Sequence, residues 1–198
     1  VTRTISHGEV RFRFVRTGAR NAFYRMLEPD RRHALHLRVA DRLAQMGGIG
    51  VEPEEVAEHY LAADAVDAAI PFAMAAADRL HAAFADARAT ELLERVAPAA
   101  SGTQRCRLLD RLASLYTRTG DYARAERVLE TLLAEFREDA RTLAVERRLA
   151  EVLLLAGKPD EARSRADGAL PDEDDPDERG RLIAIGAEAA YQHGALDD

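Results

Sequence analysis

Histidine and cysteine are the side chains with which metal binding or nucleophilic catalysis would begin in this sequence, and they are few. His33 and His36 are three residues apart and share one face of a helix, but two histidines without a third ligand make a poor metal site. His59, which precedes Tyr60, is expected to pack between helices. Cys106 has no activating base close to it in the sequence, so we expect a buried thiol rather than a nucleophile. Neither a metal site nor covalent catalysis is predicted.

Nucleotide-binding and calcium-binding loops are also missing from the sequence. Residues 157–159 (Gly-Lys-Pro) lack the glycines that cradle a phosphate, and residues 47–50 (Gly-Gly-Ile-Gly) follow a predicted helix rather than a strand. Residues 171–180, PDEDDPDERG, hold six acidic residues and two prolines, without the glycine and glutamate positions of a calcium loop. We interpret this segment as a solvated loop, with Asp177 and Glu178 at the positive start of the last helix. The sequence predicts no cofactor and no enzymatic activity.

The charge of the chain is unevenly distributed along its length. Residues 1–42 carry ten arginines and four carboxylates, a net charge of +6, whereas the remainder carries −13, which gives the total of −7. Arg11 and Arg13 in this basic region could contact the phosphates of a nucleic acid. The alternative is that the basic segment packs against another part of its own protein, and the acidic total favours this interpretation because it repels nucleic acid. Nucleic-acid binding stays the second hypothesis.

The single cysteine and the hydropathy pattern bear on the location of the protein. One cysteine cannot form an internal disulfide, which favours a reducing, cytoplasmic environment. No apolar run approaches the ~18 residues that cross a bilayer, and the first residues lack the apolar centre of a signal peptide. No membrane partner is expected.

The elements that would position these residues are almost all helices. Residues 9–15, EVRFRFV, alternate charged and apolar side chains and are the one convincing strand. Asp30 is expected to cap the helix that follows Pro29, and Pro71 is expected to kink its helix or delay its start. The predicted helices span residues 16–27, 30–45, 53–63, 66–82, 85–97, 103–118, 122–136, 140–156, 159–169 and 177–193.

Three glycines define an internal repeat. Gly120, Gly157 and Gly194 are spaced by 37 residues, and each is expected to end a helix in the left-handed conformation. Ala125 and Ala162 recur in the same register, where small side chains let two helices approach closely. A helical hairpin cannot bury its apolar face alone, so neighbouring hairpins must stack. The expected fold is all-α, a right-handed superhelix of stacked hairpins.

The stretch Leu115–Leu133 resembles a tetratricopeptide repeat (TPR), whose usual length is ~34 residues. It has Tyr116, then the turn at residues 120–122 (Gly-Asp-Tyr), then Ala125 and Leu129. The second unit departs from this pattern, with Leu153 in place of the tyrosine. The third unit, residues 183–198, is expected to contain only its first helix, as in a fragment of a longer chain.

Residues 9–100 resemble the region after the nucleotide-binding core in bacterial STAND-type or AAA-like ATPases, such as LuxR-type regulators, adenylate cyclases and Ser/Thr kinases. In that family a winged-helix remnant leads into TPR-like repeats. The resemblance implies a winged-helix-like remnant with a linking helix in residues 1–50, degenerate hairpins in 51–100 and TPR repeats in 101–198. Val15 departs from the pattern, where a histidine is often found. The residues that carry the resemblance are Phe12, Phe14, Tyr24, Leu27, Arg31, Arg32, His36, Ala40, Ala57, His59, Tyr60 and Ala69.

The resemblance to TPR proteins also implies a binding groove lined by the first helix of each hairpin. The lysine and asparagine that clamp a C-terminal carboxylate are absent, since Asp110 and Ser114 stand there, which disfavours a chaperone-tail partner. The groove would hold a protein segment, an effector or the ATPase or kinase part of the same polypeptide; a merely solvated face is the alternative. Its predicted residues are Arg107, Asp110, Ser114, Thr117, Arg118, Arg147, Glu151, Leu154, Leu155, Arg181, Glu188, Tyr191 and Gln192.

Overall fold

The computed structural model of the protein describes residues 2–6, 9–13, 17–46, 50–136 and 142–196. Val1–Ala69 form one compact unit and Ile70–Asp198 a second, and the division lies inside a helix. Each unit is described by itself below.

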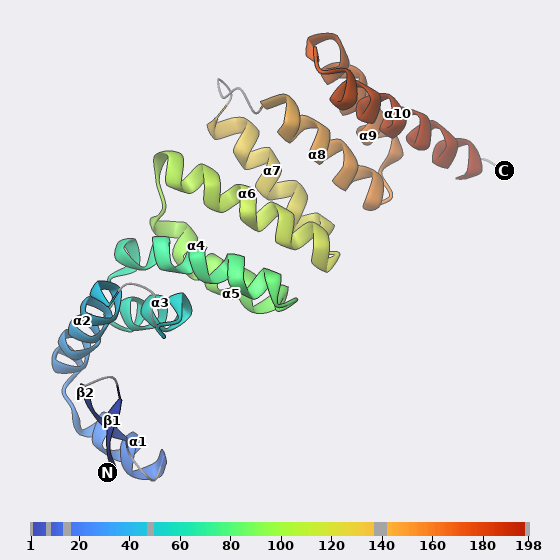
Figure 1. The fold of residues 1–198 in the computed structure, drawn as a ribbon. Coiled ribbons are helices and arrows are strands. Elements are labelled where there is room, and N and C mark those ends of the chain that lie inside the picture. Colours follow the sequence, from blue (N-terminus) through green and yellow to red (C-terminus); the bar gives the residue numbers. More distant parts are fainter. Residues whose placement is uncertain (1, 7–8, 14–16, 47–49, 137–141, 197–198) are drawn as a thin grey trace. The chain divides into compact units, whose positions relative to one another are not determined.

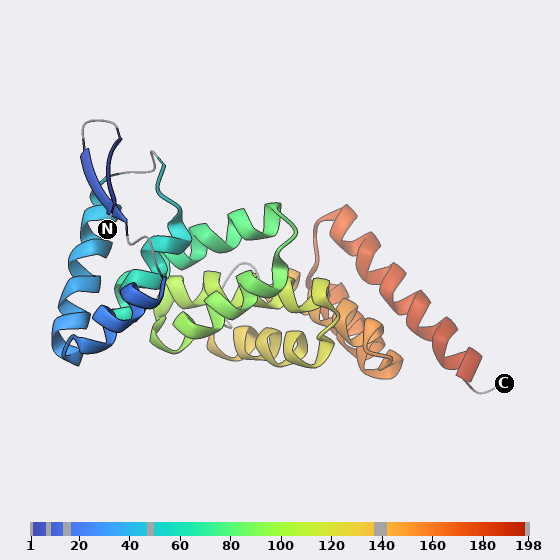
Figure 2. The same ribbon diagram turned by 90° about the horizontal axis from the view of Figure 1, so that it is seen from below.

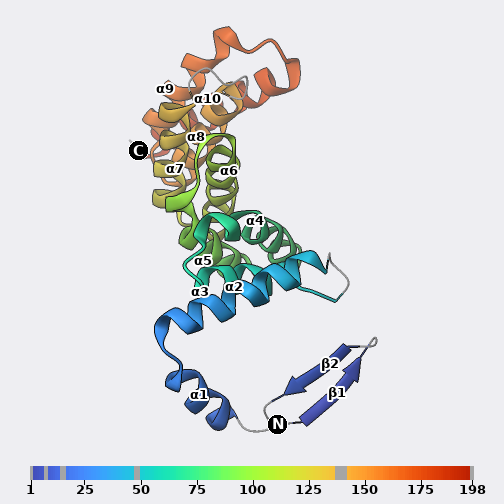
Figure 3. The same ribbon diagram turned by 90° about the vertical axis from the view of Figure 1, so that its left-hand side faces the viewer.

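Unit 1 begins with a β-hairpin and continues with helices (Figures 1 and 3). Strand β1 (Thr2–Ser6) pairs antiparallel with β2 (Glu9–Arg13), and the register places Thr4 opposite Arg11 and Ile5 opposite Val10. The sequence predicted a strand at 9–15 only, so β1 was missed. A strand pairing is a contact between two segments, and the period of either one does not reveal it. The end of the predicted strand, residues 14 and 15, lies outside the described residues.

Helices α1 (Thr17–Met26), α2 (Pro29–Gln45) and α3 (Pro53–Ala62) complete unit 1, together with the first residues of α4. The cap of α2 is Glu28, not Asp30 as predicted. Proline is preorganised for the first position of a helix and keeps the residue before it extended, so Pro29 begins the helix and Glu28 precedes it. Pro53 begins α3 after Glu52 in the same way.

Unit 2 consists of helical hairpins that follow one another along the chain. The helices are α4 (Val66–Ala82), α5 (Asp86–Val96), α6 (Gly102–Thr119), α7 (Tyr122–Glu135), α8 (Thr142–Leu155), α9 (Pro159–Ala169) and α10 (Pro176–Leu196). Figure 1 shows α6, α7 and α8 side by side, and Figure 2 shows the same helices from below. These bounds confirm the predicted helices closely. Of the two effects expected at Pro71, a kink or a delayed start, the delayed start is wrong, because α4 begins at Val66 and continues through the proline.

Two of the three repeat glycines end helices as predicted. Gly120 has φ +78° and Gly157 has φ +74°, both in the left-handed region. The amide of the following residue then reaches back into the last turn, from Asp121 N to Tyr116 O at 2.9 Å and from Lys158 N to Leu153 O at 2.9 Å. This backbone bond satisfies a carbonyl that the helix end would leave without a partner.

The third glycine does not end a helix. Gly194 lies inside α10, which continues to Leu196. The expectation was wrong because glycine permits the left-handed conformation without imposing it. The residues after Gly194 are alanine and leucine, both strong helix formers, whereas a new helix begins two residues after each of the other two glycines.

The same turn also occurs at a residue other than glycine. Phe84, between α4 and α5, has φ +59°, and Ala85 N donates to Leu80 O at 2.8 Å. An aromatic residue is strained in this conformation. The phenyl ring is 86% exposed, so packing does not compensate for the strain.

Small residues line the contacts between the helices of unit 2. Ala113 on α6, Ala125 on α7, Ala150 on α8 and Ala162 on α9 are all fully buried. Leucines fill the remaining core, and Leu182 of α10 packs with Ala150 in one buried cluster. The expected packing roles of the repeat alanines are confirmed.

Candidate functional site

Arginine–carboxylate pairs join the first helices of successive hairpins. We call α4, α6, α8 and α10 the A helices, and α5, α7 and α9 the B helices. Arg111 Nη2 of α6 lies 2.6 Å from Asp78 Oδ1 of α4. Arg147 Nε of α8 lies 2.5 Å from Glu178 Oε2 of α10. With a third pair between α6 and α8, each A helix is tied to the next.

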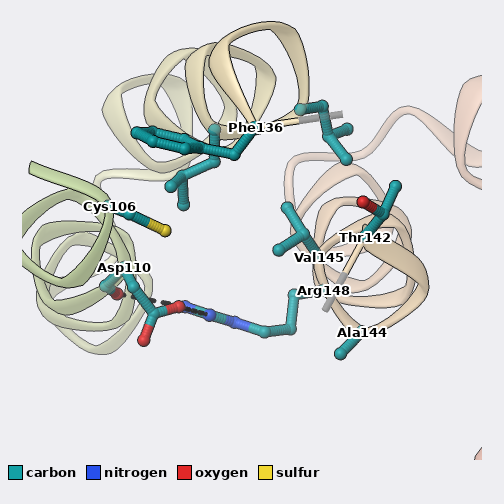
Figure 4. Close-up of a pocket in the computed structure, with 9 residues that line it drawn as sticks. Cys106, Asp110, Phe136, Thr142, Ala144, Val145 and Arg148 are labelled. Atoms are coloured by element: carbon teal, nitrogen blue, oxygen red, sulfur yellow. Dashed lines mark hydrogen bonds and ion pairs between the residues drawn. The ribbon is translucent and has the colours of Figure 1, made fainter. Parts of the chain in front are cut away.

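That third pair centres on Arg148 of α8. Its guanidinium forms an ion pair with the Asp110 carboxylate of α6 (Figure 4). It also donates to Ser114 Oγ at 2.9 Å, and Ser114 Oγ donates to Asp110 O at 3.1 Å. The Arg148 side chain is 23% exposed and that of Asp110 is 45% exposed. Water therefore screens the carboxylate end of the pair more than the guanidinium end.

Arg147, which the sequence placed in the groove, is committed to contacts within the protein. Its side chain is 14% exposed; Nε forms the ion pair with Glu178 without a hydrogen bond, and Nη1 donates to Glu151 Oε1 at 2.5 Å. Glu178 accepts from Arg181 as well, at 2.6 Å. The structure thus brings Arg147, Glu151 and Arg181 into one network, which spans α8 and α10.

Other predicted groove residues lie exposed on the A helices. Tyr191 of α10 is 73% exposed and Leu155 of α8 is 55% exposed. Arg107 of α6 is exposed, and within the described residues it makes no side-chain hydrogen bond or ion pair. Leu154 differs from these because it is half-buried against the core cluster.

The remaining predicted groove residues make local contacts. Thr117 Oγ1 donates to Ala113 O in the preceding turn at 2.8 Å. Arg118 Nε lies 3.1 Å from Asp86 Oδ2 of α5, a B helix. On α10, Gln192 donates to Glu188 Oε1 at 3.2 Å, one helical turn away.

The sequence prediction missed Arg111 and Arg148. Each of these arginines forms an ion pair with the A helix of the preceding hairpin. They are 37 residues apart, which is the period of the repeat glycines. Each reaches a carboxylate on the preceding A helix, Asp78 or Asp110. The recurrence was visible in the sequence, but the carboxylates recur at different positions, so only the structure identifies the pairs.

A second polar network joins the hairpins near their turns. Tyr116 Oη of α6 donates to Glu94 Oε1 of α5 at 2.5 Å, and Arg124 of α7 also donates to this oxygen, at 2.7 Å. The Arg124 guanidinium lies over the Tyr116 ring, 5.0 Å from its centroid. Burial and the Glu94 hydrogen bond raise the pKa of Tyr116 to about 12. Close by, His81 and Arg118 lower the pKa of Asp86, mainly through the His81 hydrogen bond.

A small cavity of about 90 Å³ lies between α6, α7 and α8 (Figure 4). Phe136, Leu132 and Val145 form apolar walls, and Asp110 with Arg148 lies at one side. Cys106, whose sulfur points into the cavity in Figure 4, is 6% exposed and forms no disulfide, so the expectation of a buried thiol is confirmed. The apolar walls suit a packing void better than a site for a polar ligand.

Two histidines of unit 1, His36 and His59, contact each other. His36 Nδ1 of α2 lies 2.8 Å from His59 Nδ1 of α3, and Tyr24 Oη of α1 lies 2.9 Å from His36 Nε2. Burial, followed by the charges of His59 and His33, lowers the pKa of His36. Among the described residues, no group of three or more His, Cys, Asp or Glu side chains is placed to hold a metal ion.

Solved structures with this arrangement of helices are TPR-like proteins. The nearly identical TPR-like repeats of a kinesin-light-chain-like protein from Podosopora anserina cover 86% of this chain and 90% of their own, at 21% identity and a TM-score of 0.56. A variant of that protein gives a TM-score of 0.57. The hairpins have the TPR-like fold. MamA of AMB-1 agrees, at 22% identity and a TM-score of 0.52, with 83% of this chain and 91% of its own covered.

These similarities establish the TPR-like fold alone. No family model and no curated protein matches the sequence. Within the described ranges, no helix has the length and apolar character that crossing a membrane requires. The side chains of Arg11 and Arg13 lie outside the described residues, so nucleic-acid binding through them stays a prediction.

Proposed function

We propose that unit 2 is a non-catalytic, TPR-like binding module that holds an extended or helical protein segment along its A helices. The supporting observation is that some arginines of the A helices already form ion pairs within the protein, whereas another is exposed without such a pair. Arg111, Arg147 and Arg148 are engaged with carboxylates of neighbouring helices. Arg107 is left for a partner.

The character of the exposed residues indicates the partner's chemistry. Arg107 offers a guanidinium, and Leu155 offers an exposed apolar side chain on the next A helix. A segment with an acidic residue and, further along, an apolar residue complements both. The internal ion pairs hold the A helices in place, so the partner meets a surface that is already formed and pays little ordering entropy.

The parent of this module, we propose, is a larger bacterial signalling protein of the STAND or AAA-like type, which would pass the bound state to an ATPase, kinase or transcriptional output. This rests on the resemblance of residues 9–100. The test is the coding sequence upstream of residue 1. A G-x-x-x-x-G-K-[ST] loop there supports the proposal, and an upstream region without a nucleotide-binding domain contradicts it.

The binding proposal is tested by comparing surface variants in affinity capture from the source cell. The A-helix variant carries Arg107→Glu and Leu155→Ser, both at exposed positions. The matched control carries Arg127→Glu and Arg163→Glu, which are exposed on B helices. We expect partners that bind the wild type and the control to be lost from the A-helix variant. If the A-helix variant retains every partner, the proposed surface is wrong.

A further inference from the structure

Four turns between helices share one backbone geometry. In each of them, one residue has φ between +56° and +78°, and the amide of the next residue donates to the carbonyl five residues before it, at 2.8–2.9 Å. Glycine adopts this conformation without strain, and aspartate tolerates it better than most residues. The residues at this position are Asp64, Phe84, Gly120 and Gly157. Phe84 is therefore the one of the four whose side chain is poorly suited to the turn.

The helix after Phe84 also begins without the cap that follows Gly120. The Asp121 side chain accepts a hydrogen bond from the amide of Arg124 at the start of α7. Ala85 stands at the same place before α5 and has no side-chain cap hydrogen bond. Local preferences thus oppose this turn twice, through the strained aromatic residue and through the missing cap.

Side chains on either side of Phe84 hold the turn in place. His81 Nδ1 and Asp86 Oδ1 lie 2.7 Å apart across it, and Arg118 Nε of α6 lies 3.1 Å from Asp86 Oδ2. The Asp86 side chain is 15% exposed, so water screens this carboxylate less than one on the surface. A strained residue persists where the surrounding structure fixes it, and such residues cluster at functional sites.

The phenyl ring of Phe84 points away from the core. At 86%, it is the most exposed of the large apolar side chains that the structure describes. Ala82, Ala83 and Ala87 are also exposed, so the nearest residues along the chain on this surface are small and apolar. Aromatic side chains are enriched in the centre of protein interfaces, and a turn that is already fixed loses little entropy on binding.

Arg118 places a positive charge beside this ring. Its side chain is 50% exposed, and its Nε contacts Asp86, which is two residues after Phe84. Within the described residues, its terminal nitrogens Nη1 and Nη2 make no hydrogen bond. They remain available to a carboxylate of a partner, which a guanidinium binds with charge-assisted hydrogen bonds.

We propose that Phe84 anchors a second protein-binding surface at the α4–α5 turn, distinct from the surface of Arg107 and Leu155. The partner is a protein with an apolar pocket that takes the phenyl ring and with an acidic side chain at the edge of this pocket, which pairs with Arg118. The contact between His81 and Asp86 keeps the turn from relaxing. A lipid bilayer fits less well, because one ring is a small anchor and anionic headgroups repel a chain of net charge −7.

Photo-cross-linking in the source cell tests this anchor. The chain carries p-benzoyl-phenylalanine in place of Phe84 or, as the matched control, in place of Met26, which is 77% exposed. We expect a protein to cross-link at position 84 and not at position 26, through an apolar residue that has an aspartate or glutamate beside it in that protein. Cross-links to lipid or to a second copy of this chain alone, or none specific to position 84, would overturn the proposal.

Binding of the purified cross-linking protein then measures what the ring contributes. Phe84→Ser and Phe84→Gly should each raise the dissociation constant about tenfold or more, and Arg118→Gln should raise it several-fold. Met26→Ser should leave it unchanged. Phe84→Gly is the sharpest variant, because glycine suits the left-handed turn, so thermal unfolding should show a fold at least as stable as the wild type. A Phe84→Gly variant that binds as tightly as the wild type would contradict the anchoring role.

Discussion

Arg148 of α8 reaches back to the preceding hairpin and binds Asp110 of α6, 38 residues earlier in the chain. The contact joins the A helices of two successive hairpins, between which the chain forms α7. It fixes the spacing of the surface that we propose binds a partner.

Removing this contact should destabilise the protein modestly. We expect Arg148→Ala to lower the free energy of unfolding by about 1 kcal/mol, because the pair is partly exposed and screened by water. Urea unfolding measures the change. Arg163→Ala is the control, since Arg163 and Asp167 form an exposed pair within one helix, at 3.6 Å, and the substitution should cost less than about 0.5 kcal/mol.

A double-mutant cycle separates the ion pair from the other contacts of Arg148. Arg148→Ala and Asp110→Ala should couple by roughly 0.5–1 kcal/mol, because the two groups touch. Additive effects of the two substitutions would show that the pair contributes nothing to stability.

Relieving the strained turn at Phe84 should stabilise the protein. Phe84→Gly removes a left-handed strain of about 1–2 kcal/mol at the cost of about 0.5–1 kcal/mol of backbone entropy, so a net gain of roughly 0.5–1 kcal/mol is expected. The exposed ring loses no packing. Thermal unfolding measures the gain. Phe84→Ala keeps the left-handed strain and should leave stability nearly unchanged; an equal gain from alanine would place the effect in the ring rather than the backbone.

The reverse substitution probes the same turn at Gly157. Gly157→Ala should destabilise by about 1 kcal/mol, because φ is +74° and a Cβ there meets open space, so the loss reports backbone strain alone. If urea unfolding shows no decrease in the free energy of unfolding, the turn has relaxed to another conformation in the variant.

The stability of unit 2 should fall at alkaline pH because of Tyr116. Its pKa of about 12 in the fold exceeds the unfolded value of ~10, so between these values the unfolded chain loses the proton first. The contribution of Tyr116 to the stability of the fold is therefore complete below pH ~10 and is lost as the pH rises towards 12. Titration by tyrosinate absorbance should show a late phase that Tyr116→Phe abolishes and Glu94→Gln shifts to lower pH. A wild-type titration without the late phase would contradict the assignment.

Acid should weaken unit 1 through His36. Its pKa in the fold lies below the unfolded value of ~6.5, so the neutral imidazole is the form that the fold favours. Stability is complete above pH ~6.5 and declines as the pH falls towards the lower folded pKa, since the unfolded chain binds the proton first. NMR titration of the imidazole should give a pKa below ~6.5 for His36. His59→Gln should raise the pKa of His36, because it removes a neighbouring positive charge. An unchanged pKa would show that His59 does not contribute to the shift.

Helix positions were predictable because local patterns determine them. The helix at 122–136, for example, follows from Asp121 as a cap, whose side chain accepts from Arg124 N at 3.1 Å, and from the apolar spacing of Ala125, Leu129 and Leu132. Strand β1 was not predictable in this way. It forms by pairing with β2, and the residue pattern of one strand does not reveal which segment pairs with it.

The sequence by itself determined the repeating unit: its length of 37 residues, its left-handed turns at Gly120 and Gly157, and its small residues where helices cross. Only the tertiary structure decided which charged side chains form ion pairs within the protein. Arg147 and Arg148 pair with carboxylates of neighbouring helices, whereas Arg107 is exposed. The physical reason is that helix formation depends on neighbours within about four residues, whereas pairing and burial depend on side chains that stacking brings together from a whole repeat away.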